Sequence, residues 1–76
     1  MNRKSELIRS IDEVEKMIED LEKMRWLLEK HLDSSGPKVR EVYNNVGAEI
    51  EKKSLIKERL KYALALVEQE ENENPP

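Results

Sequence analysis

The sequence predicts an all-α fold, an antiparallel two-helix hairpin of the coiled-coil type. Two long segments carry apolar residues at alternating spacings of three and four, which is the heptad pattern of packed helices. One strong breaker cluster, at residues 33–37, lies between them, and its Gly-Pro step can end one helix and begin another. Charged residues make up 41% of the 76 residues and aromatic residues 4%, a composition typical of surface-rich helices.

The first helix is expected over about residues 3–32. Its heptad seam consists of Leu7, Ile11, Val14, Ile18, Leu21, Arg25, Leu28 and Leu32. Methionines at 17 and 24 and His31 lie seven residues apart beside this seam and widen the apolar face. Asn2 or Ser5 can cap the helix start. Residues 10–13 match a capping box, but the seam runs through them, so one continuous helix is predicted.

The second helix is expected over about residues 38–70. Its seam keeps the same register through Val39, Tyr43, Val46, Ile50, Lys53, Lys57, Leu60, Leu64 and Val67. Gly47 weakens a helix by about 1 kcal/mol relative to Ala and allows either a kink or a close approach by another backbone. In an antiparallel hairpin about the turn at residues 33–37, two residues that face each other have numbers that sum to roughly 70. This places Leu64 near Leu7.

A second apolar face follows the predicted second helix on the side away from its seam. Ala48, Leu55 and Tyr62 recur every seven residues there, and residues 60–67 are apolar nearly all round. A helix that is apolar on both faces is usually buried on both. The sequence therefore predicts further helices, most simply from a second copy, and hence a homodimer that forms a four-helix bundle.

The domain organisation follows from these elements. Residues 1–71 are predicted to form one helical-hairpin domain, with the turn at 33–37. Residues 72–76 continue an acidic run that ends in two prolines, and we expect them to be disordered because negative charge opposes the dipole at a helix C-terminus. A single core in so short a chain supplies only about 3–5 kcal/mol, which again favours a partner.

Three side chains are candidates for partner binding. Trp26, the single tryptophan, lies beside the seam on the side away from Met17 and Met24, and tryptophan is favoured as an interface anchor. Leu55 and Tyr62 belong to the second apolar face of the second helix. The leading functional hypothesis is a non-enzymatic module, such as a small adaptor, chaperone or inhibitor, that presents a helical surface to another protein.

The alternative hypothesis is an oligomer that sequesters a small anion such as a nucleotide. It depends on the three cationic residues at seam positions, Arg25, Lys53 and Lys57, forming a positive layer inside the bundle. Such polar seam residues also commonly fix register or pair with a glutamate, so a structural role is the competing interpretation.

Other functional classes are not expected. There is no cysteine and one histidine, His31, so the usual thiolate and paired-histidine metal sites cannot form, and we predict no cofactor and no metal. No nucleophile–base or phosphate-loop pattern occurs, so an enzyme is not expected. A net charge of −3 with interleaved signs disfavours nucleic acid, and no apolar run is long enough for a membrane span. A cytoplasmic location is the expectation.

Overall fold

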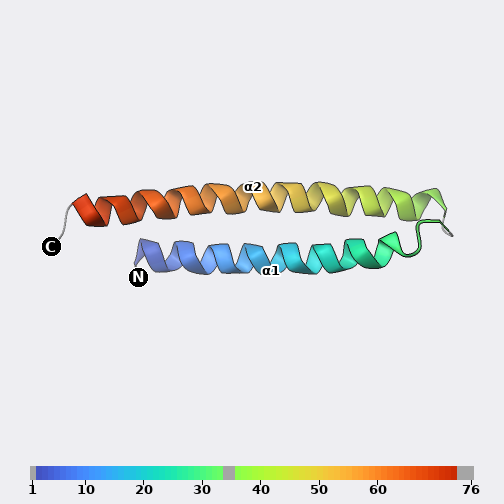
Figure 1. Ribbon diagram of the computed structural model, residues 1–76, viewed down its shortest axis with the longest axis horizontal. Helices are drawn as coiled ribbons and strands as arrows, with labels where there is room; N and C mark the ends of the chain where they lie inside the picture. The colour runs from blue at the N-terminus through green and yellow to red at the C-terminus, as the bar shows by residue number, and fades with distance from the viewer. Residues whose placement is uncertain (1, 34–35, 74–76) are drawn as a thin grey trace.

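Two antiparallel helices make up most of the described structure. The computed structural model describes residues 2–33 and 36–73, in which α1 spans Arg3–Glu29 and α2 spans Pro37–Glu73. The helices lie side by side along their length and make a rod with extents of 62 × 15 × 15 Å (Figure 1). The all-α antiparallel hairpin predicted from the heptad pattern is confirmed.

Asn2 caps the start of α1. Its backbone is extended, with φ −89° and ψ 131°, and its side-chain oxygen accepts a hydrogen bond of 2.8 Å from the N–H of Lys4. The carbonyl of Asn2 accepts the N–H of Glu6 at 3.1 Å, as a capping residue does. Of the two predicted caps the structure therefore uses Asn2, and α1 continues through the capping-box pattern at residues 10–13.

The first helix ends three residues earlier than the seam predicts. After Glu29 the chain forms turns through Asp33, and the N–H groups of His31 and Leu32 bond to carbonyls three residues back, at 3.0 and 3.4 Å. Such bonds satisfy helix-end carbonyls by tightening the last turn. Leu32 remains half-buried, so the last residue of the seam packs against the hairpin although it lies beyond the end of the helix.

Pro37 is the first residue of α2, where its missing N–H and fixed φ suit the helix start. The carbonyl of Gly36 accepts the N–H of Val39 at 3.2 Å. The helix then continues to Glu73, so residues 72 and 73 of the predicted tail are helical. Residues 74–76 of that tail, and Ser34 and Ser35 of the predicted turn, lie outside the described residues.

Gly47 does not interrupt α2. The helix is continuous through it, and a Cβ added there would meet nothing within 4 Å. Within one chain, Gly47 is therefore not a point of close approach to another backbone.

The core of the hairpin is thin. Among the described residues only Ile11, Val46 and Ile50 are buried, at 8%, 7% and 9% exposure, and all three are seam residues. The remaining seam residues are half-buried, which is the geometry of two rods that touch along one line. A single copy therefore buries little of its apolar surface.

Contacts between the helices fix their register. Arg3 pairs with Glu70 and Tyr43 bonds to Glu29, so the numbers of facing residues sum to 72–73. The sequence estimate was roughly 70. The difference arises because α2 begins beyond the end of α1, so that Tyr43, in the second turn of α2, stands level with Glu29. Figure 1 shows the first turns of α2 extending past the end of α1.

Candidate functional site

Exposed apolar side chains are the main surface feature of the hairpin, and they suggest a binding surface. In the described residues the following large hydrophobic side chains are at least 40% exposed: Ile8, Met17, Met24, Trp26, Leu27, Val42, Leu55, Ile56, Tyr62 and Leu66. Scattered single residues of this kind are ordinary on a protein surface, whereas contiguous rows mark interaction sites. Whether these side chains mark an interaction site therefore depends on whether they form contiguous rows along the two helices.

Trp26 lies on the side of α1 away from Met17 and Met24, and the residue is 55% exposed. Its indole lines a shallow groove together with Glu19, Glu22 and Lys23. The ammonium of Lys30, one turn later, lies 3.6 Å from the ring centroid in a cation–π contact. One face of the indole thus carries a positive charge from the C-cap residue of its own helix, and much of the rest is open to solvent.

Leu55 and Tyr62 lie on the face of α2 opposite its seam. Leu55 is 53% exposed and Tyr62 is 69% exposed, the highest value among the large hydrophobic side chains of the described residues. They are two turns apart on one face of the helix, as the sequence spacing predicts.

These three candidates do not form one patch. In the observed register Trp26 stands level with residue 47 of α2, so Leu55 and Tyr62 lie about 12 and 22 Å further along the rod. Trp26 and the Leu55–Tyr62 pair also occupy outer faces of different helices. A partner can thus engage the tryptophan without covering the Leu55–Tyr62 face.

The three seam cations are spread along the hairpin. All of them are half-buried, and Nζ of Lys53 lies 3.9 Å from Oε2 of Glu49 on the same helix. Arg25 is close enough to Tyr43 for its charge to act on the phenol. In the observed register Lys53 and Lys57 stand about 7 and 13 Å along the axis from Arg25. The structure places them on one seam but not in one layer.

The antiparallel register joins apolar residues of both helices along one side of the rod. Arg3 and Glu70 form an ion pair at one end of this side. Every seventh residue after Arg3, and every seventh residue before Glu70, lies on the same side of its helix. We call this side of the rod the methionine flank. It consists of Ser10, Met17 and Met24 from α1 and His31 from the turn that follows α1, with Val42, Glu49, Ile56 and Ala63 from α2. Arg3, Ser10 and Ala63 line one groove, as this register requires.

The opposite side of the rod is polar. We call it the glutamate flank, and it consists of Ile8, Glu15, Glu22 and Glu29 from α1 with Arg40, Gly47, Ser54, Lys61 and Glu68 from α2. Ile8, Glu15 and Lys61 line a common groove, which shows that the two helices meet here in the same register. Ile8 is the single large apolar residue of this flank.

Sequence reasoning found only half of the methionine flank. The spacing of Met17, Met24 and His31 predicts a row in the first segment, whereas the prediction for the second segment does not include Val42, Ile56 and Ala63 as a row. Their spacings of fourteen and seven are a usable signal, but Glu49 interrupts them. Only the pairing of the two helices shows that both rows lie on the same side.

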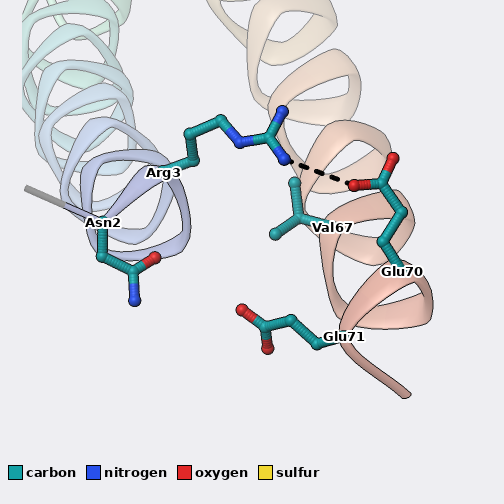
Figure 2. Close-up of a pocket in the computed structure, with 5 residues that line it drawn as sticks. All are labelled: Asn2, Arg3, Val67, Glu70 and Glu71. Carbon is teal, nitrogen blue, oxygen red and sulfur yellow. Dashed lines mark hydrogen bonds and ion pairs between the residues drawn. The ribbon is translucent and has the colours of Figure 1, made fainter. Parts of the chain in front are cut away.

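The open ends of the helices form a polar groove. It is lined by Asn2, Arg3, Val67, Glu70 and Glu71, and Figure 2 shows the Arg3 guanidinium reaching toward the Glu70 carboxylate. These groups are 3.3 Å apart, and Nζ of Lys4 lies 3.7 Å from Oε2 of Glu71. The side chains of Arg3, Glu70 and Glu71 are exposed and that of Lys4 is partly exposed, so the two ion pairs mark the register of the helices and add little stability.

Two other kinds of site are absent from the described residues. No group of three or more histidine, cysteine, aspartate or glutamate side chains in them could hold a metal ion. Within residues 2–33 and 36–73, neither helix has a stretch long and apolar enough to cross a membrane.

Comparisons with protein-family models, curated proteins and solved structures gave no match to this chain. The function is therefore inferred from the chain's own residues.

Proposed function

We propose that this chain is a non-enzymatic protein–protein interaction module, a small adaptor, chaperone or inhibitor, that acts as a homodimeric four-helix bundle. The single observation that carries the proposal is the imbalance of its apolar surface. Three hydrophobic residues of the described chain are buried, while ten large ones are 40% exposed or more. A chain with so thin a core gains stability mainly by covering that surface with other helices.

The anchors for a second protein are Trp26 and the Leu55–Tyr62 pair. Tryptophan and tyrosine bury a large area with few rotatable bonds, and they dominate binding energy at interfaces. Because the two anchors lie on different helices, each is tested by its own variant. The spread of Arg25, Lys53 and Lys57 along the seam, with Lys53 already beside Glu49, offers no comparable support for anion sequestration.

The test is an affinity capture from the native cell with the wild-type chain and with Trp26→Ala, Leu55→Ala and Tyr62→Ala variants. We expect at least one anchor variant to lose a captured protein that the wild type retains. Arg9→Ala, a change at an exposed polar position of α1, is the control and should retain it. The proposal is wrong if all three anchor variants capture the same proteins as the wild type.

A further inference from the structure

The methionine flank is the one side of the hairpin where both helices present apolar side chains next to the seam. We propose that a second copy of this chain covers this flank, and that the glutamate flank stays in solvent. This inference rests on the proposed function, because it names the face through which the module pairs with itself. It also departs from the sequence-based expectation, in which the Leu55–Tyr62 face recruits the second copy.

The pattern of the flank matches what a four-helix bundle needs. Core-facing helices of bundles carry apolar residues at the two seam positions and at one position beside the seam, about three in every seven. In α1 the third position is filled by Met17 and Met24, and in α2 by Val42, Ile56 and Ala63. When two hairpins pack together on this side, the residues of the methionine flank extend the seam of each hairpin into one shared core.

The amount of exposed surface fits a partner of this size. A folded monomer of 9.0 kDa is expected to expose about 4,900 Å². This chain exposes 6187 Å², a surplus of about 1,300 Å², which exceeds the roughly 800 Å² that each partner contributes to a standard interface. The elongated rod thus has enough spare surface for a stable dimer.

The charges at the end of the methionine flank are complementary between two copies of the chain. Its open end carries both Arg3 and Glu70, so a two-fold axis parallel to the helices places each Arg3 beside the Glu70 of the other copy. The one acidic residue within the flank, Glu49, lies 3.8 and 3.9 Å from the ammonium groups of Lys52 and Lys53. Docking therefore buries no carboxylate without a cation beside it.

A membrane surface fits the flank less well than a second copy. Helices that lie on membranes carry mainly Lys and Arg on their polar face. The glutamate flank carries four glutamates beside Arg40 and Lys61, and the chain has a net charge of −3. Anionic vesicles are accordingly expected to leave the protein in solution.

The closing experiment measures the oligomeric state of matched variants by sedimentation equilibrium. Met17→Glu changes the methionine flank and Ile8→Glu changes the glutamate flank, and the two side chains are almost equally exposed, at 48% and 49%. We expect Met17→Glu to weaken the dimer by more than about tenfold, because the new charge is buried twice in a symmetric interface. Ile8→Glu should leave the dissociation constant within a few-fold of the wild type.

A milder pair of changes guards against loss of folding. Gln is as good a helix former as Met, so Met17→Gln with Met24→Gln preserves helix propensity and should still weaken the dimer by more than about tenfold. If a methionine-flank variant unfolds on dilution while Ile8→Glu stays folded, the coupling of folding to association also supports the inference. Equal dimer affinity in all variants, or loss of the dimer in Ile8→Glu alone, would overturn it.

Trp26 gives an independent readout, since it lies away from the methionine flank. Its emission maximum should stay constant while wild-type protein is diluted through dimer dissociation with its helix content unchanged. A shift under those conditions would place the second copy on the wrong side. The anchor variants separate this inference from the proposed function. Trp26→Ala and Tyr62→Ala should remain dimeric even if they lose a different partner, and dimers without any such partner would refute only the broader proposal.

Discussion

The hydroxyl of Tyr43 donates a hydrogen bond of 2.8 Å to Oε1 of Glu29 and so joins the second turn of α2 to the last residue of α1. The hydrogen bond to the carboxylate raises the pKa of Tyr43 above its ordinary value. Partial desolvation and the negative charge of Glu29 act in the same direction, and the positive charge of Arg25 opposes them. The stability of the hairpin at its turn end therefore depends on the titration of Tyr43 at alkaline pH.

The first prediction concerns this titration. The folded state holds the Tyr43 proton more tightly than the unfolded chain does, so this contribution to stability is fully present below about pH 10 and is lost as the pH rises through the raised pKa. Tyr43→Phe should therefore lose less stability than wild type between about pH 9 and 11. Urea denaturation followed by circular dichroism measures this, with Tyr62→Phe as the control. An identical alkaline loss in Tyr43→Phe and wild type would contradict the prediction.

The second prediction tests the thin core. Ile50→Ala removes a buried side chain from the seam and should reduce the free energy of unfolding by about 2–5 kcal/mol. Leu55→Ala changes an exposed site, and its effect on stability should stay within about 0.5 kcal/mol in either direction. Chemical denaturation at fixed protein concentration compares the two. If both variants lose the same stability, the assignment of the buried seam is wrong.

The third prediction concerns Gly47. It lies in a continuous helix, and an added Cβ meets nothing within 4 Å. Gly47→Ala should raise the free energy of unfolding by about 1 kcal/mol, because Ala restricts the unfolded chain and favours the helix. Thermal and urea denaturation measure the gain. Because Gly47 lies on the glutamate flank, dimer affinity should not change, and a weaker dimer would show that the second copy packs there instead.

The fourth prediction concerns the cap of α1. Asn2→Ala removes the side-chain acceptor for the N–H of Lys4 and should cost about 1 kcal/mol. Asn2→Ser keeps an oxygen at the same position and should stay close to wild type. Helix content and denaturation midpoints distinguish the two. Equal losses in both variants would mean that the capping bond adds nothing.

The fifth prediction addresses the anion hypothesis. Because Arg25, Lys53 and Lys57 are spread along the seam, inorganic phosphate or a nucleotide should leave the melting temperature where sodium chloride of equal ionic strength leaves it. Differential scanning calorimetry makes the comparison. A rise of several degrees that depends on the anion, and that Lys57→Ala removes, would revive the sequestration role.

Much of the fold could be predicted because it depends on local patterns. The seam from Leu7 to Leu32 and the Gly36-Pro37 step define two helices and their common face without any knowledge of distant contacts. The end of α1 at Glu29 could not be read in this way. Leu32 keeps the apolar spacing although its backbone has already left the helix, so periodicity overestimates the helical length.

The candidate interaction surface was harder to predict, because it depends on pairing between the helices. The methionines of α1 and Ile56 of α2 become neighbours only once the register is known. That register depends on how far the start of α2 extends past the end of α1, which no local pattern specifies. The sequence therefore revealed the apolar excess on α2 but assigned it to the Leu55–Tyr62 face.

The most direct test of the account is the mass of the wild-type chain in solution, measured by sedimentation equilibrium at micromolar concentration. We predict a dimer of twice the 9.0 kDa chain mass, which dissociates on dilution with a coupled loss of thermal stability. A stable, fully helical monomer whose melting temperature is independent of concentration would contradict the claim that this hairpin needs a partner to cover its apolar surface.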